Sequence, residues 1–477
     1  MLTKKNKDIT ILIIGKILQV IIALASIRIL TEVLSEQEVG NYYLLLTVLA
    51  FFNFSFLNPL GQYYGRYLIK WKDGKNLFNA TRVLLVLRTS GILLALFVSY
   101  GVYQVFEYDR YYTLNEFLLF IFISLTAGIH GVLLSAINVL GSRIKFVTYT
   151  ILSLFFGLLL SLIIIHFIGK TSMNWLYGVA VSQLFFSIGI YKSVIKGNKF
   201  SVQKIKSVLN KNYIKKITIF LTPIVITLFL QWGQNISYRF IIEIKYSLEV
   251  LAFIGVGLAI SSSIFATVES LASQFYNPIY LKNITYANKE GRENAWNELV
   301  DCMMPIYIFV AIFIIALSPY LVNFLVAQKF HEAYIYTMYG AIIEFFRVMT
   351  NLVYKVSQSE VKTKTTVVPY AVGFFSTVVF LYMFDFSDKF WAIPLVLIVT
   401  NIIVFILLFQ NMNKLLNLKI QITNIVKSFV LVSPLFLALL FNSDKVILQN
   451  FLVLSISSCY LIFLTYIVTR KRILGGE

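Results

Sequence analysis

Long apolar runs follow one another along the whole chain, and only short polar breaks separate them. Each run is about 20 residues long, which is the length a helix needs to cross a hydrocarbon core of about 30 Å. Little chain is left for a soluble domain. The pattern therefore predicts an all-α polytopic membrane protein of about fourteen transmembrane helices, at residues 9–30, 41–60, 83–103, 114–137, 146–168, 173–191, 214–235, 250–272, 301–322, 333–352, 366–385, 390–410, 424–441 and 446–468.

The composition agrees with this class. Of the 477 residues, 58% are hydrophobic and only 13% are charged, whereas soluble proteins carry about 25% charged residues. Because so little chain lies outside the apolar runs, the net charge of +19 is interpreted as a signal of membrane sidedness and not of nucleic-acid binding. Cys302 and Cys459 both fall in apolar runs, so neither a disulfide framework nor a metal or other cofactor is expected.

Lysines and arginines are divided unevenly between the connections. The even-numbered connections and the termini, with the span-edge residues Lys215, Lys216 and Lys427, hold 30 of the 41 cationic residues, whereas the odd-numbered connections hold 7. Cationic connections stay in the cytoplasm, so both termini are predicted to be cytoplasmic. The largest basic group, within residues 192–216, is expected to lie on anionic lipid headgroups.

The predicted outer connections are short and lean acidic. A membrane glycosyltransferase or polysaccharide polymerase, the main rival from another class, would need a sizeable outer loop to hold carboxylates or arginines over a sugar. The pattern therefore argues against an enzyme, and no catalytic residue is assigned.

The chain also repeats itself at an offset of 211 residues. Residues 26–39 (SIRILTEVLSEQEV) align without a gap with residues 237–250 (SYRFIIEIKYSLEV), which pairs Arg28 with Arg239. Because an even number of spans separates the repeats, both have the same orientation in the membrane. The predicted organisation is an N-terminal six-helix bundle at 1–200, a second like-oriented bundle at 201–412 and two additional C-terminal helices at 413–477.

A family resemblance accompanies the repeat. The segment RILTEVLSEQEVGNYYLLLTVLAFF (28–52), followed by NPLGQYYGRYL (58–68), resembles the first two spans of polysaccharide transporters of the multidrug, oligosaccharidyl-lipid and polysaccharide exporter superfamily, of the O-antigen flippase type. The resemblance implies a V-shaped pair of bundles whose first, second, seventh and eighth spans face a cavity. With the two extra spans, the total resembles the larger number of spans in the lipid-linked peptidoglycan precursor flippases. The substrate of those flippases therefore remains an alternative for this chain.

Polar residues inside the spans are candidates for binding substrate, since a charge at the bilayer centre costs about 2.5 to 3.5 kcal/mol. Lys16 and Arg88 lie near the cytoplasmic ends of their predicted spans and could also snorkel to the headgroups. Arg28 has an alternative in a salt bridge to Glu32, one turn further on. The full set of substrate-binding candidates is Lys16, Arg28, Asn58, Gln62, Arg66, Arg88, Gln231 and Asn235.

Two carboxylates are candidates for ion coupling. Glu344 lies three residues before Arg347, so the two are expected to pair. Glu269, which the repeat places opposite Asn58, has no cation within a turn of its own helix and is expected to take up a proton readily. His130 lies within an apolar run and is expected to be satisfied by a hydrogen bond between helices.

Together these features favour a flippase that carries an undecaprenyl-pyrophosphate-linked oligosaccharide across a bacterial plasma membrane by alternating access. The partners expected are this substrate, membrane lipids and a coupling H⁺ or Na⁺, with the protein acting as a monomer. A lipid-linked peptidoglycan precursor flippase and a multidrug or cation antiporter of the same superfamily remain alternatives.

Overall fold

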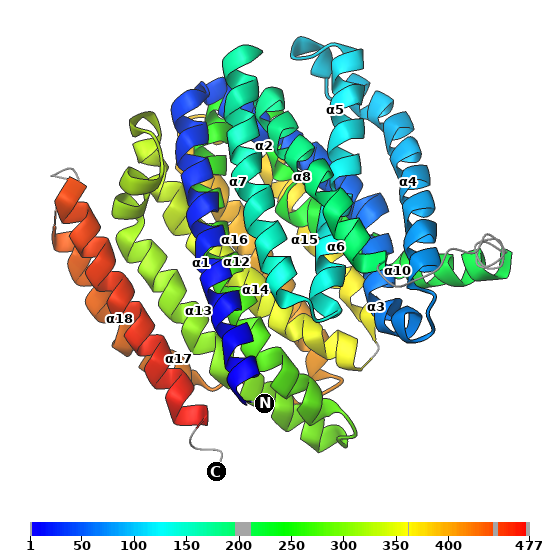
Figure 1. Ribbon diagram of the computed structural model, residues 1–477. Helices are drawn as coiled ribbons and strands as arrows, with labels where there is room; N and C mark the ends of the chain where they lie inside the picture. The colour runs from blue at the N-terminus through cyan, green and yellow to red at the C-terminus, as the bar shows by residue number, and fades with distance from the viewer. Residues whose placement is uncertain (1, 196–210, 361, 442–446, 474–477) are drawn as a thin grey trace. The chain divides into compact units, whose positions relative to one another are not determined.

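In the computed structural model, which describes residues 2–195, 211–360, 362–441 and 447–473, the described chain consists of helices joined by short turns (Figure 1). Twelve helical segments of these residues are long and apolar enough to cross a membrane. The all-α, multi-pass membrane class predicted from the sequence is therefore confirmed.

All fourteen predicted spans coincide with helical segments. The α-helices are α1 Leu2–Val33, α2 Glu36–Phe52, α3 Asn58–Asp73, α4 Leu77–Val105, α5 Leu114–Ala127, α6 Ile129–Val139, α7 Arg143–Phe167, α8 Ser172–Ile195, α10 Lys211–Asn235, α11 Tyr238–Lys245, α12 Leu248–Ile284, α13 Lys289–Leu325, α14 Tyr334–Ser359, α15 Val367–Met383, α16 Ile393–Asn413, α17 Ile422–Val432 and α18 Ile447–Ile473. A π-helix, Asn53–Leu57, joins α2 to α3, and short 3₁₀ turns include η3 Gln328–Ala333 and η6 Ser433–Leu440.

The helix ends differ from the predicted span ends. Helices α12 and α13 have 37 residues each, and α4 begins at Leu77, six residues before the predicted start. Hydropathy marks the part of a helix that lies in hydrocarbon, whereas polar residues can continue the same helix beyond it. Three spans predicted as single helices are interrupted, one by the π-helix, one at Gly128 and one by the 3₁₀ turn η6.

Backbone contacts divide the chain into two compact units. Unit 1 comprises Met1–Ser26 and Asn41–Phe240, and unit 2 comprises Ile27–Gly40 and Ile241–Glu477. Helix α10 contacts α3 and the π-helix and so belongs to unit 1. The domain boundary predicted near residue 200 lies outside the described residues, as does most of the basic group of residues 192–216.

Unit 1 is built on a core shared by α3, α4, α6 and α8, which includes Leu68, Leu77, Leu133 and Ile190. Helices α7 and α8 lie side by side (Figure 1) and approach closely through small residues. A Cβ added at Gly178 would lie 2.2 Å from the backbone nitrogen of Ser161. Such contacts between small residues are how helices gain packing energy in lipid, where apolar burial alone gives little.

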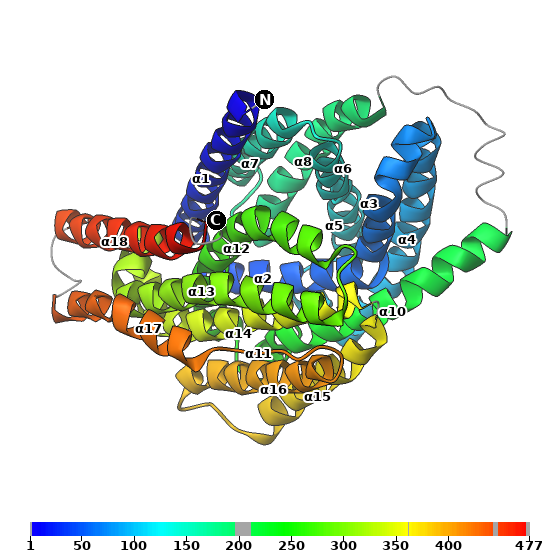
Figure 2. The ribbon, with the colours of Figure 1, turned by 90° about the horizontal axis from the view of Figure 1, so that it is seen from below.

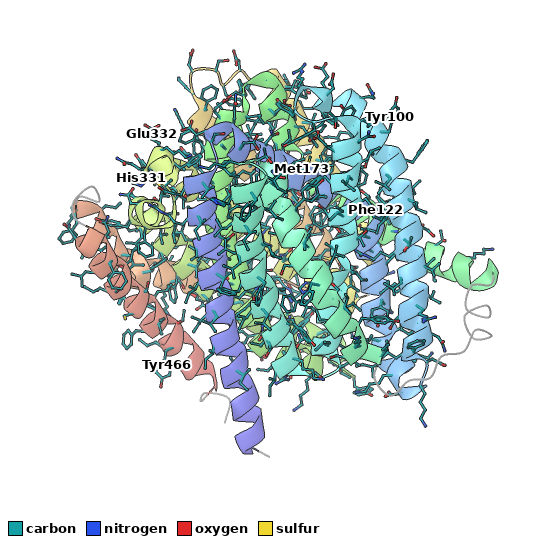
Figure 3. All side chains as sticks on the ribbon, turned by 45° about the horizontal axis from the view of Figure 1, so that its top comes forward. Tyr100, Phe122, Met173, His331, Glu332 and Tyr466 are labelled. Carbon is teal, nitrogen blue, oxygen red and sulfur yellow. The ribbon has the colours of Figure 1, made fainter. Side chains whose placement is uncertain are left out.

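The outer faces of the helices carry apolar side chains that no other helix covers. Tyr100 and Phe122 lie on such faces of α4 and α5, with exposed fractions of 53% and 45%, and Tyr466 of α18 is 57% exposed (Figure 3). In a soluble protein so much exposed apolar surface would be a liability. In this chain it is the surface that meets the lipid.

Unit 2 is organised around α13. This helix contacts α12, α14, α17 and α18 (Figure 2). In its most apolar stretch of 18 residues, 83% of the residues are buried. The Tyr320 hydroxyl oxygen lies 2.8 and 2.7 Å from the carbonyl oxygens of Ala438 and Phe441, which share its single O–H donor. The two C-terminal helices therefore have a structural role in covering α13.

Side-chain cations of unit 2 donate hydrogen bonds to carbonyl oxygens at helix C-termini. Lys245 Nζ donates to the carbonyl oxygens of Leu381 and Phe384, at 3.0 and 3.1 Å, at the end of α15. Arg28 donates to the carbonyl oxygen of Val326, just past the end of α13. Cations are favourable there because the last carbonyls of a helix lack intrahelical donors and carry partial negative charge.

Candidate functional site

Unit 1 contains a cavity of about 570 Å³, here named the Arg88 cavity. It is lined by α2, the π-helix, α3, Arg88 of α4, and the region where α5 gives way to α6. Asn58 and Gln62, both predicted to bind substrate, lie in its wall together with Asn53 and Ser135. The described residues that line it include no aspartate or glutamate.

Pro59 explains the π-helix beside this cavity. Proline has no backbone N–H, and its ring clashes with the carbonyl four residues earlier, so the regular hydrogen-bond ladder cannot continue. The Asn58 N–H instead bonds to the carbonyl of Asn53, five residues back. Wide turns of this kind are frequent at functional sites, and here Asn53 and Asn58 both line the cavity.

Arg88 is buried in α4, with only 3% of its surface exposed. Its Nη2 donates to the carbonyl oxygen of Leu125 at 3.2 Å, whereas its Nε has no hydrogen-bond partner among the described residues. Arg88 therefore lies inside unit 1, against α5, and its side chain does not extend to the surface of the protein as snorkelling would require.

Gly128 makes room for the guanidinium. Helix α5 ends at Ala127 and α6 begins at Ile129, and a Cβ on Gly128 would lie 2.7 Å from Arg88 Nη2 and 3.5 Å from Asn53 Oδ1. Any other residue would crowd the charge. Arg88 thus lies at the C-terminal end of α5, where a cation is favoured.

The other candidates of unit 1 are spread more widely. Arg66 lies one turn beyond Gln62 on α3 and is exposed. Lys16 donates to Gln19 Oε1 at 3.0 Å within α1. On α10, Asn235 Nδ2 donates to the carbonyl of Gln231 at 3.0 Å.

The expectation for His130 is wrong. Its Nε2 is buried and has no hydrogen-bond partner among the described residues. The prediction rested on neighbouring helices supplying a partner, and the described parts of those helices supply none.

Unit 2 contains a second cavity, of about 590 Å³, between α12 and α14, here named the Arg347 cavity. Arg347 Nη2 lies 3.1 Å from Glu269 Oε2 and its Nε lies 2.6 Å from Glu344 Oε2. Asn351 Nδ2 donates to the other oxygen of Glu269 at 2.9 Å. The three charged side chains are 12 to 29% exposed.

The pair between Glu344 and Arg347 is confirmed, whereas the expectation that Glu269 lacks a cation is wrong. The cation comes from α14, which packs on α12. The spacing within α12 cannot reveal it. One signal was present in the sequence: Glu344, Arg347, Asn351 and Lys355 lie at helical spacing on one face of the predicted tenth span.

The two cavities occupy corresponding positions in the repeat. The offset of 211 pairs Asn58 with Glu269 and Gln62 with Ser273, and the first member of each pair lines the Arg88 cavity while the second lines the Arg347 cavity. The chemistry of the two walls differs. An arginine and amides line the unit 1 cavity, which suits an anion, whereas two carboxylates sharing one arginine suit a cation in unit 2.

Arg28 lies on neither cavity wall. Besides its bond to Val326, its Nη2 lies 3.5 Å from Glu32 Oε2. The salt bridge weighed as the alternative for Arg28 is therefore present.

Comparison by sequence gives no match, either to a family model or to a curated protein. Comparison of the fold gives clear matches. The chain is similar to the lipid II flippase MurJ in an inward closed conformation, at 12% identity and a TM-score of 0.68, over 97% of this chain and 99% of that one.

Multidrug transporters have the same fold. A MATE family transporter of the MOP superfamily, in an inward-facing conformation, matches at 12% identity and a TM-score of 0.58, over 83% of this chain and 95% of that one. A eukaryotic MATE transporter matches at 12% identity and a TM-score of 0.55, over 90% and 99%. The chain therefore has the fold of the MOP superfamily transporters.

Proposed function

We propose that the protein is a flippase that moves an undecaprenyl-pyrophosphate-linked oligosaccharide from the cytoplasmic to the outer leaflet of a bacterial plasma membrane. The product would serve the synthesis of a cell-surface polysaccharide such as O-antigen or capsule. No bond is made or broken, and the two units open the path to each side in turn. The observation that carries the proposal is the Arg88 cavity, where a buried guanidinium lies among amide and hydroxyl side chains.

The chemistry of this substrate fits the cavity wall. A pyrophosphate is an anion with many acceptor oxygens, which guanidinium groups bind well. Sugars offer hydroxyl groups to amides such as those of Asn58 and Gln62. The prenyl chain can stay in the lipid. A drug or cation antiporter would be better served by an acidic wall.

The extent of the structural match also supports a lipid-linked substrate. The match to MurJ leaves out about 14 residues of this chain, and therefore includes most of α17 and α18. The match to the inward-facing MATE family transporter leaves out 17% of this chain. This observation favours a second candidate, a flippase for the lipid-linked peptidoglycan precursor, with the same mechanism and a different sugar.

Genetic complementation tests the proposal and separates the two substrates. The gene is expressed in one strain that lacks its O-antigen flippase and in another whose peptidoglycan precursor flippase can be switched off. We expect restored surface polymer in the first strain. Growth of the second strain alone would assign the peptidoglycan precursor, and failure in both would contradict a flippase.

For energy coupling we propose the Arg347 cavity. Glu269 and Glu344 share one guanidinium, so one carboxylate can bind H⁺ or Na⁺ while the other keeps Arg347 paired.

Transport into proteoliposomes under an imposed pH or sodium gradient tests the coupling. Glu269→Gln should remove the response to the gradient, because the carboxylate that exchanges the ion is gone. Glu332→Gln, at an exposed glutamate of η3 (Figure 3), is the matched control and should respond as the wild type does. An unchanged response of Glu269→Gln would remove Glu269 from the coupling mechanism.

The proposal also includes the sidedness and the state of assembly. We place both termini in the cytoplasm of a bacterial cell with the protein in its plasma membrane, because the cationic residues favour the even-numbered connections. We expect a monomer, since each unit has its own cavity.

A further inference from the structure

We infer that the Arg88 cavity is the site that binds the diphosphate group of the substrate, with Arg88 as its principal ligand. The inference rests on the proposed function and deepens it, because it locates the charged group of the substrate in unit 1. Three independent features of the structure support it: an incompletely bonded buried cation, the polar groups around it, and the opposite charge pattern of the corresponding cavity in unit 2.

The first feature is the bonding of Arg88. A guanidinium has five N–H donors. Nη2 donates to Leu125, whereas Nε is buried without a partner. Arg88 forms no ion pair within the part of the chain that the structure describes. A buried cation without a counter-charge is costly, so an anion that entered the cavity lined by Arg88 would supply the missing charge.

The second feature is the wall around Arg88. Asn58, Gln62 and Ser135 bring amide and hydroxyl groups to the same cavity. The planar fork of arginine binds phosphate oxygens in pairs, and neutral donors complete the shell. A volume of about 570 Å³ lies within the range typical of small-molecule sites. A diphosphate with its first sugar is a ligand of suitable size and polarity.

The third feature is the contrast between the repeats. The corresponding positions in unit 2 carry Glu269 and Ser273, beside the pair of Glu344 and Arg347. An anion would be repelled there, since the two carboxylates outnumber the guanidinium. The substrate diphosphate is therefore assigned to unit 1 alone.

Arg88 also has a structural role, which the test must separate from binding. Its Nη2 donates to the Leu125 carbonyl near the end of α5, whereas its charge has no counter-ion among the described residues and remains for a ligand. A purely structural role predicts a less stable protein whose folded fraction binds as the wild type does. A ligand role predicts weaker binding by protein that is folded.

The test measures binding by the full-length protein in detergent. The probe is farnesyl diphosphate, and farnesol and inorganic pyrophosphate are the comparison compounds. We expect saturable binding of farnesyl diphosphate that Arg88→Gln weakens at least about tenfold, the loss expected for a hydrogen bond between charged groups. Arg88→Lys should retain part of the affinity. Arg82→Gln, at an exposed arginine of the same helix, should leave it unchanged.

A second variant keeps the test informative if Arg88→Gln does not fold. Gly128→Ala retains the charge but places a methyl group against the guanidinium, so it should also weaken binding. Equal affinity of folded Arg88→Gln and wild type would overturn the inference. Equal binding of inorganic pyrophosphate and farnesyl diphosphate would assign the site to a free anion and overturn the lipid-linked source.

The results also separate this inference from the proposed function. If the wild type complements a flippase-null strain and Arg88→Gln binds farnesyl diphosphate normally, the site assignment alone fails. If binding depends on Arg88 but the wild type flips no lipid-linked oligosaccharide, the proposed function fails and the diphosphate site stands.

Discussion

Removal of Arg347 should destabilise the protein more than removal of either carboxylate that it contacts. In Arg347→Gln, Glu269 and Glu344 both lose their cation, at 3.1 and 2.6 Å. Breaking a buried ion pair from one side costs about 3 to 5 kcal/mol. The side chains here are 12 to 29% exposed, so water screens part of the effect and we expect about 2 to 4 kcal/mol.

The single carboxylate variants should cost less. In Glu344→Gln, Arg347 keeps Glu269, and in Glu269→Gln it keeps Glu344, so we expect about 1 kcal/mol in each case. If Arg347 paired with Glu344 alone, as their spacing on one helix suggests, loss of Glu344 would leave Arg347 unpaired. The contact with Glu269 changes that expectation, because no charge is left alone.

Thermal unfolding in detergent ranks the three variants by stability. All scans use one fixed rate because unfolding can be irreversible. Arg347→Gln should lower the apparent Tm by about 5 °C or more, and Arg82→Gln is the arginine control. The triple variant with Gln at 269, 344 and 347 should recover part of the loss, since no buried charge remains. Wild-type Tm in Arg347→Gln, or a larger loss in Glu344→Gln, would refute the shared ion pair.

Three further predictions follow from sidedness, surface charge and packing. A reporter fused after Asp109 should be external and one fused after Lys72 cytoplasmic, and the reverse result would overturn the assigned sides. Arg66→Ala should abolish complementation at unchanged protein level while Arg66→Lys keeps part of it; normal surface polymer in Arg66→Ala would exclude this residue as a ligand. Gly178→Ala should lower the stability measured by thermal unfolding by about 1 to 3 kcal/mol, because its methyl group meets the Ser161 backbone. Gly101→Ala, which has open space around it, should leave the stability unchanged. Equal stability of the two variants would contradict the close packing of α7 and α8.

The sequence predicted the helices well because the length of an apolar run can be recognised without knowing which helices lie beside it. The length of each run matches the bilayer, so Ile393–Asn413 and Arg143–Phe167 are found within a few residues of their predicted spans. The internal repeat went further. It paired Asn58 with Glu269, and the two residues line corresponding cavities.

What the sequence could not predict are contacts between helices far apart along the chain. Arg347 lies 78 residues from Glu269, and only the packing of α14 on α12 brings them together. In the same way, the burial of Arg88 depends on a contact with Leu125, 37 residues away, which the position of Arg88 in its own span cannot reveal. The π-helix before Pro59 likewise depends on where the displaced hydrogen bond finds a partner, which the presence of a proline does not specify.

Flipping by the purified protein tests the central claim most directly. Proteoliposomes are prepared with a fluorescent undecaprenyl-pyrophosphate-linked oligosaccharide in both leaflets, and a membrane-impermeant reductant quenches the label outside. With wild-type protein, quenching should proceed past the outer-leaflet fraction as inner-leaflet molecules are moved out, and Arg88→Gln should slow this second phase. Quenching that stops at the outer-leaflet fraction, as in protein-free liposomes, would contradict a lipid-linked oligosaccharide flippase.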